Sequence, residues 1–215
     1  MDANDALFLL VRHGVTICNE TDCYRGQSDD ASTALTKKGV KQAKVAGRFI
    51  SRLPVKIGII YCSDLERTKH SAALIASILG IQHIHTDPRL LPLDVGDFTG
   101  ESKEDNSIDE YLANPEEPFP NGESVDTFRK RQEDFADSLM VWIKNHPTEK
   151  PLVVGHLSNV VYFADLEKSL PGYLKEYSSN KEDLINPGGI VAVMPDDKVV
   201  PLLGENKNRK EDDKL

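Results

Sequence analysis

Two arginines and two histidines stand where apolar runs of strand length give way to polar sequence. Arg12 and His13 follow the run ALFLLV, His156 follows LVVG, and Arg67 comes four residues after YCS. If these runs are neighbouring parallel strands, their carboxyl ends lie at one edge of a sheet. The pattern therefore predicts a single site with two guanidinium and two imidazole groups.

Such a set of side chains is suited to a phosphoryl group. Arginine offers a planar fork of donors that matches phosphoryl oxygens bidentately, and it stays charged at any working pH. Histidine titrates near neutrality, so it can act as a neutral nucleophile or as a charged donor. Together these groups can neutralise the phosphoryl oxygens during transfer without a metal ion. The site then still needs a group that protonates the leaving alkoxide.

The elements that must position these groups alternate between strands and helices. The run over 6–12 predicts a strand buried on both faces, and 56–63 predicts a second strand. Between them, Thr36 is a suitable N-cap for a helix that ends before Pro54. A further helix is predicted over 64–79.

The rest of the chain continues this alternation and adds one long loop excursion. The expected elements are extended pieces at 81–86 and 89–95, a loop over 96–122 with a helical turn or two near 107–113, a helix at 123–145, a strand at 151–156, a helix at 159–168, and a hairpin of GGIVAVMP and KVVPLL around Asp196 and Asp197. This order predicts a three-layer α/β/α domain with a mostly parallel central sheet, spanning residues 1–203. The polar tail over 204–215 is predicted to be disordered.

Composition and charge exclude several classes of protein. The 215 residues are 39% hydrophobic and 28% charged, which is typical of a soluble globular protein. A formal net charge of −9 argues against a general nucleic-acid binder. Because no apolar run is long enough to span a membrane and the start lacks the basic flank of a signal peptide, we expect a cytoplasmic protein with no membrane partner. Three cysteines without a CxxC pair predict reduced thiols.

Six motifs in a fixed order resemble the histidine phosphatase superfamily, also called phosphoglycerate-mutase-like, in its first branch. They are RHGVTICN (12–19), LTKKGVKQA (35–43), SDLERTKHSA (63–72), LDVGDFTG (93–100), PNGES (120–124) and VVGH (153–156). The resemblance runs from about residue 7 to residue 203. It implies a phosphoglycerate-mutase-like fold and hydrolysis of a small phosphoester, with no cofactor and no metal ion.

The resemblance also implies roles for individual residues. His13 would attack phosphorus and become a phosphohistidine that water hydrolyses, while Arg12, Arg67 and His156 clamp the phosphoryl group. The residues expected to bind substrate are Gly14, Thr16, Asn19 and Glu123. The oligomeric state is left open, with a homodimer among the possibilities.

One position departs from the family. Where the family has its proton-donating glutamate, in a run like LxExxxGxxxG, this chain reads LLPLDVGDFTG, with Pro92 in place of the glutamate. Asp94 is the natural substitute, because two positions along an extended chain return a side chain to the same face. Asp97, Glu101 and Glu123 are further candidates.

Three rival functions follow from the same residues. A mutase would move phosphate between two hydroxyls of a phosphoglycerate. A binding protein would keep the phosphate cradle without the acid missing at Pro92. A metal hydrolase would use His83 and His85, although edge-strand polarity explains that pair better because no carboxylate or cysteine accompanies it. The charge run RKRQED (129–134) indicates a solvated helix face, with Arg129 as a side candidate for substrate contact.

Overall fold

The computed structural model describes residues 3–164, 186–195 and 199–203. Six strands form one sheet in the order β3-β2-β4-β1-β5-β6. They are β1 (Phe8–Arg12), β2 (Ile57–Cys62), β3 (Ile84–Thr86), β4 (Lys150–Gly155), β5 (Ile190–Val193) and β6 (Val199–Leu203). The strands β3, β2, β4 and β1 run parallel, whereas β5 and β6 pair antiparallel. The expected mostly parallel sheet is confirmed.

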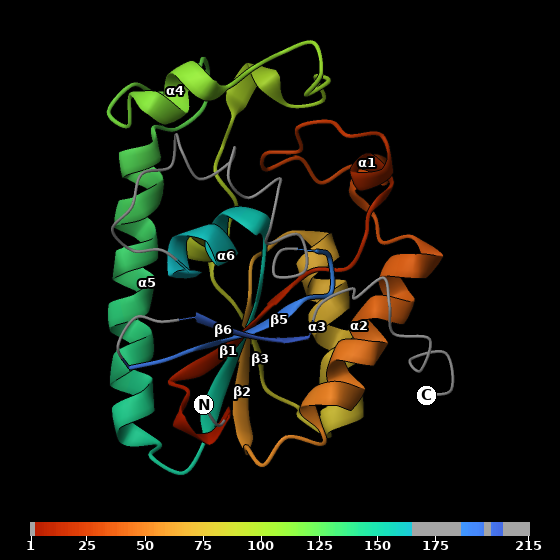
Figure 1. The fold of residues 1–215 in the computed structure, drawn as a ribbon, viewed down its shortest axis with the longest axis vertical. Helices are drawn as coiled ribbons and strands as arrows, with labels where there is room; N and C mark the ends of the chain where they lie inside the picture. Colours follow the sequence, from red (N-terminus) through yellow and green to blue (C-terminus); the bar gives the residue numbers. More distant parts are fainter. Residues whose placement is uncertain (1–2, 165–185, 196–198, 204–215) are drawn as a thin grey trace.

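Helices cover both faces of this sheet. Figure 1 shows α2 (Lys37–Ile50) and α3 (Glu66–Leu79) on one side, and α5 (Val125–Asn145) and α6 (Leu157–Ala164) on the other. The short helices α1 (Ile17–Glu20) and α4 (Asp109–Ala113) lie at the end of the molecule opposite the N-terminus. The three-layer arrangement places the carboxyl ends of the parallel strands beneath α1.

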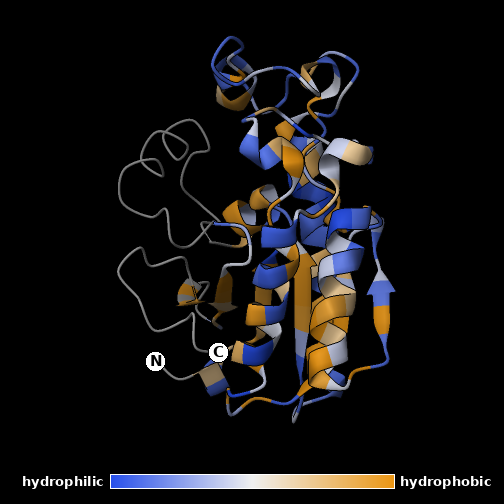
Figure 2. Cartoon of the chain, turned by 90° about the vertical axis from the view of Figure 1, so that its right-hand side faces the viewer, coloured by the Kyte–Doolittle hydropathy of each residue, from blue (hydrophilic) through white to orange (hydrophobic). Residues whose placement is uncertain are grey.

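The residues of β1 show why the sheet needs a layer on each face. Leu9 and Val11 belong to the apolar cluster that includes residues of α2 and α3, whereas Phe8 and Leu10 belong to the cluster that includes residues of α5 and α6. Successive side chains of a strand point to opposite faces, so a continuous apolar run requires both layers. In Figure 2, which faces α2 and α3, strands in the hydrophobic colour lie in the middle of the domain behind these helices.

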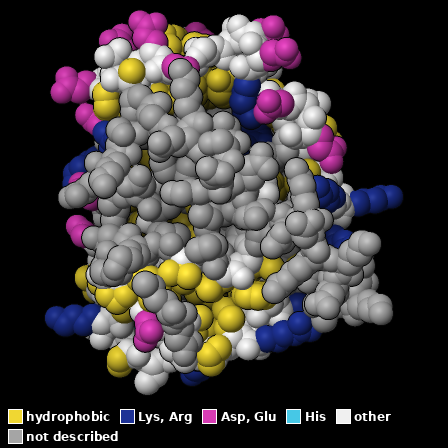
Figure 3. Space-filling model, in the orientation of Figure 1, with side chains coloured by type: hydrophobic (Ala, Val, Ile, Leu, Met, Phe, Trp, Pro, Cys, Tyr) yellow, Lys and Arg dark blue, Asp and Glu magenta, His cyan; other side chains and the backbone are white. Residues whose placement is uncertain are grey.

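A third apolar cluster lies in the excursion over 93–125. It consists of Val95, Ile108, Leu112, Phe119 and Val125. Backbone hydrogen bonds from Asp97 to the Pro120 carbonyl and from Glu123 to the Asp94 carbonyl close the segment on itself. The excursion is therefore a packed cap with its own small core. Over this cap, Asp and Glu side chains gather on the face drawn in Figure 3.

Several helix ends carry residues that favour a helix terminus. The Thr36 hydroxyl accepts a hydrogen bond from the Gly39 amide at the start of α2, and Gly80 ends α3 with φ of 70°. The α5 helix starts at Val125, slightly later than expected, because the Ser124 hydroxyl caps it by accepting from the Thr127 amide.

Several expectations need correction or lie outside the described residues. The extended piece expected over 89–95 begins instead as a 3-10 turn at Pro88–Leu90, because Asp87 accepts from the Arg89 amide and Pro88 suits a first helical position. The end of the helix expected to reach residue 168, the hairpin turn at Asp196 and Asp197, and the tail over 204–215 lie outside the described ranges. Within those ranges, none of the helices combines the length and apolar character needed to cross a lipid bilayer.

The expectation of reduced thiols is wrong for two of the three cysteines. Cys18 and Cys23 form a disulfide with Cα atoms 5.8 Å apart, whereas Cys62 is a free thiol buried in the core. The short helix α1 and the turn after it bring the two residues within the range that a disulfide requires. Spacing along the chain did not reveal this pairing because the pattern is not a CxxC.

Candidate active site

The rings of His13 and His156 lie side by side at the ends of neighbouring strands. Their centroids are 5.3 Å apart, and both side chains are buried. Strands β1 and β4 pair in parallel register, with Arg12 opposite Gly155, and the His13 amide donates to the Gly155 carbonyl. The parallel pairing therefore brings together two histidines that lie far apart in the sequence.

A close backbone contact holds the loop that carries His13. A Cβ atom on Gly14 would collide with the Gly39 carbonyl oxygen, and one on Gly39 would collide with the Val15 carbonyl oxygen. Glycine at both positions lets the start of α2 pack directly against the loop. The Gly14 amide also donates to the Ser71 hydroxyl of α3, at 3.3 Å. These contacts fix the backbone around His13.

The ring of His13 is oriented by its own loop. Its Nδ1 lies 2.7 Å from the Gly14 carbonyl oxygen. A carbonyl oxygen only accepts hydrogen bonds, so this contact assigns the proton of the neutral ring to Nδ1. The other nitrogen, Nε2, then carries a lone pair.

His156 is held from both its ring and its backbone. Its Nε2 lies 2.8 Å from the Ser63 hydroxyl, and its amide donates to the Asn159 side-chain oxygen at 2.7 Å. Asn159 in turn donates to Gln132 of α5. Within the described residues, the buried Nδ1 of His156 has no hydrogen-bond partner. A buried polar atom of this kind is suited to an incoming ligand.

Arg67 lies in the first turn of α3 and is 1% exposed. Its guanidinium donates to the carbonyl oxygens of Ser28 and Gly26, at 2.8 and 3.0 Å. Its Nε is buried and has no hydrogen-bond partner within the described residues. Arg12, the last residue of β1, is 7% exposed. Both arginines therefore belong to the buried surroundings of the two histidines.

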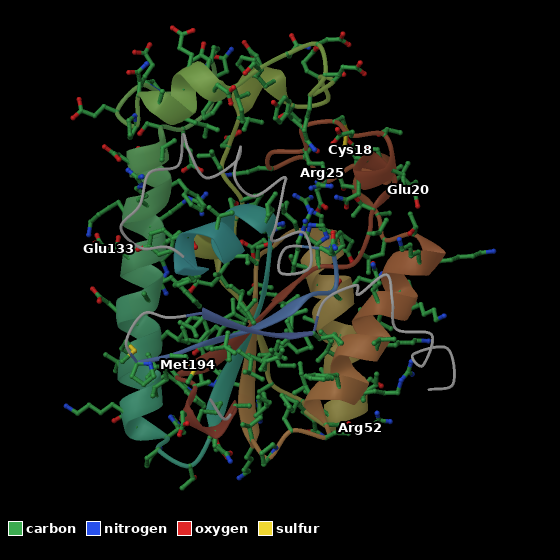
Figure 4. All side chains as sticks on the ribbon, in the orientation of Figure 1. Cys18, Glu20, Arg25, Arg52, Glu133 and Met194 are labelled. Carbon is green, nitrogen blue, oxygen red and sulfur yellow. A yellow bond between two sulfur atoms is a disulfide. The ribbon has the colours of Figure 1, made fainter. Side chains whose placement is uncertain are left out.

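A third arginine, Arg25, joins the cluster from the loop after α1 (Figure 4). Its Nη1 lies 3.5 Å from the Thr16 hydroxyl oxygen. Among the charged groups that lower the pKa of His13, Arg25 acts most strongly, ahead of Arg12 and Arg67. Sequence reasoning missed this residue, although an arginine before a glycine in the loop between RHG and LTKKG was a visible signal.

Burial and mutual repulsion shape the electrostatics of the cluster. Burial, followed by the nearby positive charges, lowers the pKa of His13 and His156 well below the ordinary value of 6.5. Burial also lowers the pKa of Arg12 to about 9 and those of Arg25 and Arg67 to about 10. At neutral pH the imidazoles are therefore neutral and the guanidiniums charged. An anion between them relieves the repulsion.

A comparison with family models identifies the group of proteins to which this arrangement belongs. Residues 8–168 match the model described as "Histidine phosphatase superfamily (branch 1)". The chain belongs to this superfamily.

Individual histidine phosphatases and related structures agree with this assignment. The chain is 33% identical over 154 residues to the probable phosphoglycerate mutase GpmB of Erwinia tasmaniensis, a match that covers 68% of this chain and 67% of that protein. The phosphoglycerate mutase structure from Thermus thermophilus is 25% identical, with a TM-score of 0.65 over 93% of this chain and 99% of that one. The alpha-ribazole phosphatase from Shigella flexneri is 21% identical, with a TM-score of 0.68 over 93% and 96%. The expected phosphoglycerate-mutase-like fold is confirmed.

Residues 92–94, where the resemblance leads one to expect a glutamate, are tightly held. Arg131 of α5 donates to the Glu123 carboxylate at 2.6 Å and to the Pro92 carbonyl at 2.8 Å. The Glu123 carboxylate also accepts from the Asp94 amide, at 2.9 Å. Glu123 thus lies in an ion pair that ties α5 to residues 92–94. The reading of RKRQED as a wholly solvated face is wrong for Arg131 and for buried Gln132.

The candidate acids differ in their surroundings. Pro92 is buried, and its carbonyl accepts from Gln27 at 3.1 Å. Asp94 is half-buried, and its Oδ1 accepts from the Gly96 amide at 3.0 Å. Asp97 is exposed and bound to Asn121, and exposed Glu101 is bound to Asn106.

The remaining predicted residues have mainly local contacts. The Asn19 side-chain oxygen accepts from the amide and hydroxyl of Thr16, at 3.0 and 2.9 Å, so it stabilises the turn after His13. His85 lies on the edge strand β3 against the ring of Tyr61. Throughout 3–164, 186–195 and 199–203, no three metal-ligating side chains gather. Arg129 pairs with Asp126 on the surface of α5.

Proposed function

We propose that this protein is a metal-independent phosphomonoesterase that hydrolyses a small phosphoester through a phosphohistidine on His13. The carrying observation is the pairing of His13 and His156, 5.3 Å apart, beside three arginines. The positive charges of the arginines suit an anionic ligand, and the neutral imidazole between them suits nucleophilic attack. A phosphoryl group needs both the charge and the nucleophile.

The nucleophile is Nε2 of His13. Because Nδ1 donates to the Gly14 carbonyl, the lone pair on Nε2 is free to attack phosphorus. The new bond joins Nε2 to phosphorus as the bond from phosphorus to the ester oxygen breaks. The low pKa of His13 keeps the ring in this neutral, nucleophilic form at neutral pH.

The phosphoryl oxygens are held by Arg12, Arg67 and His156. The buried Nε of Arg67 and the buried Nδ1 of His156 are donors that a phosphoryl oxygen satisfies. For Nδ1 to donate, the proton of the neutral His156 ring lies there, and Nε2 accepts from the Ser63 hydroxyl. The guanidiniums then stabilise the charge that spreads over these oxygens in the transition state.

Asp94 supplies the proton to the leaving alkoxide. Leu93 and Val95 pack into the apolar cluster of the cap, and Asp94 stands between them in the segment that follows the 3-10 turn at Pro88–Leu90. One carboxyl oxygen accepts from the Gly96 amide, which leaves the other to carry the proton. After transfer, the carboxylate takes a proton from water as the water oxygen attacks phosphorus, and inorganic phosphate leaves His13.

Rapid alkaline quench of the enzyme during turnover of a 32P-labelled phosphoester tests this mechanism. The expected result is an acid-labile, alkali-stable label on His13 that disappears in His13→Ala. Turnover without any such label would overturn the phosphohistidine. A full panel of phosphoesters with no turnover would instead favour a phosphate-binding protein that lacks the acid of its relatives at Pro92.

A mutase is the second candidate, because the chain is similar to the phosphoglycerate mutases of Erwinia tasmaniensis and Thermus thermophilus. Product analysis with 3-phosphoglycerate separates the two reactions. A phosphatase releases inorganic phosphate and glycerate, whereas a mutase forms 2-phosphoglycerate.

A further inference from the structure

Arg25 is anchored at the boundary between the phosphoryl pocket and the cap. On one side, the Tyr24 amide donates to the Glu101 carbonyl at 3.0 Å, and the Tyr24 ring packs edge-on against Phe98 of the cap. On the other side, the Gly26 carbonyl accepts from Arg67. The backbone of Arg25 is thus tied both to the cap and to an arginine of the pocket.

The guanidinium of Arg25 has few partners within the described part of the chain. Its one hydrogen bond there is the 3.5 Å contact with Thr16, and no carboxylate of those residues lies within ion-pair distance. Asp22 is the acid that favours its charge, but Asp22 is itself paired with Lys103. By contrast, the half-buried Arg131 has a carboxylate and several carbonyl oxygens as partners.

No Arg25 nitrogen is among the fully buried, unsatisfied polar atoms of the described residues, so its spare donors remain open to solvent or to a ligand. On the proposed function, the phosphoryl group binds at the strand ends that carry His13 and His156, so the organic part of the substrate must extend away from the sheet, toward the end of the molecule where the cap lies (Figure 1). Arg25 stands on that side, since its neighbours Tyr24 and Gly26 contact residues 95–101. The guanidinium of Arg25 can therefore bind a group on the part of the substrate that is not transferred.

We propose that Arg25 binds a second anionic group of the substrate, a carboxylate or a second phosphate, beside the phosphoryl group that is transferred. This inference rests on the proposed phosphatase function for its site and extends it to a class of substrate. The second anion accepts two N–H donors from the planar guanidinium, as carboxylates and phosphates do. Simple neutral alcohol phosphates lack this contact.

The test compares two phosphoesters that differ in one group. 3-Phosphoglycerate carries a carboxylate where glycerol 3-phosphate carries a hydroxymethyl group. We expect the wild-type protein to prefer 3-phosphoglycerate, and Arg25→Gln to raise its KM about 10- to 100-fold, the worth of a charge-assisted hydrogen bond. The same substitution should lower kcat/KM for glycerol 3-phosphate by a clearly smaller factor, which measures what the Arg25 charge contributes through His13 alone. Arg52→Gln, at the far end of α2 in Figure 4, is the matched control for loss of one positive charge.

Three outcomes overturn the inference. If Arg25→Gln lowers kcat/KM equally for both substrates, Arg25 contacts the transferred phosphoryl group instead. If it lowers kcat/KM for neither, Arg25 binds no part of the substrate. If the wild-type protein does not prefer 3-phosphoglycerate, the site does not recognise a second anion. Calorimetric binding of both compounds to the His13→Ala variant separates this inference from the proposed function. If the wild-type protein turns over neither compound, an Arg25-dependent binding preference supports the inference while the phosphatase reaction fails.

Discussion

The hydroxyl oxygen of Ser63 lies 2.8 Å from Nε2 of His156, where the paired strands β2 and β4 end. Ser63 also contacts Thr68 at 2.7 Å, so it links the ring to the first turn of α3. A hydrogen bond at Nε2 sets which nitrogen of the ring carries the proton.

Ser63→Ala should therefore lower kcat/KM about tenfold, because one buried hydrogen bond contributes on the order of 1 to 1.5 kcal/mol. The loss should be accompanied by a shift of the pH profile, which a purely structural role would not cause. Steady-state kinetics from pH 5 to 9 measure both. Ser77→Ala, on the exposed side of α3, is the control. An unchanged profile would argue against the link.

Asp94→Asn should lower kcat by about 100- to 10,000-fold, the usual contribution of general acid catalysis. The amide oxygen keeps the hydrogen bond from Gly96, but the amide N–H is too weak an acid to protonate the leaving group. Substrates with good leaving groups, such as p-nitrophenyl phosphate, should lose much less because their leaving group needs no proton. Asp97→Asn, exposed in the same segment, should leave kcat unchanged. If Asp97→Asn is the slower variant, the assignment moves to Asp97.

The free energy of unfolding should fall as the pH drops below 6.5. His13 and His156 have lowered pKa values in the folded protein, whereas the unfolded chain binds protons with the ordinary value near 6.5. The unfolded state then binds more protons at acid pH, so their contribution is complete above 6.5 and is lost below it.

Urea unfolding at several pH values tests this linkage. The stability gap between wild type and His13→Gln should change by up to about 1.4 kcal/mol per pH unit in the acid range, in the direction that favours the variant. A gap that stays constant from pH 7.5 to 5 would show that His13 titrates alike in both states.

Reduction of the Cys18–Cys23 disulfide should weaken the loop that carries Arg25. Cross-linking residues five positions apart contributes about 2 kcal/mol through the restricted unfolded chain. Dithiothreitol should lower the melting temperature of the wild-type protein and raise its KM for 3-phosphoglycerate. The Cys18→Ser/Cys23→Ser variant should show both changes without reductant and no further response to it. A wild-type protein that is indifferent to the reagent would contradict this prediction.

The sheet and the edge that carries the candidate site could be predicted from sequence because their signals are local. Apolar runs such as LVVG predict buried strands, and parallel pairing then carries Arg12, His13 and His156 to one edge. The surroundings of that edge depend on contacts between distant segments. Gln132 and Asn159 are polar residues that only tertiary packing buries.

Arginines show the same limit. Arg131 and Arg129 belong to the same mixed charge run. Arg131 donates hydrogen bonds to the carbonyl oxygens of Arg89 and Pro92, whereas Arg129 pairs with Asp126 on the surface. Charge alone does not distinguish them, since both can extend a long side chain to either place. The 3-10 turn at Pro88–Leu90 and the Cys18–Cys23 disulfide were not predicted for a related reason, because both depend on the local geometry of a turn.

The bare backbone contact between Gly14 and Gly39 has a consequence for how this sequence can evolve. A methyl group at residue 39 would push the His13 loop aside although it touches no substrate. Natural selection should thus keep position 39 as invariant as His13, the proposed nucleophile, and random mutagenesis libraries should return inactive clones at both glycines.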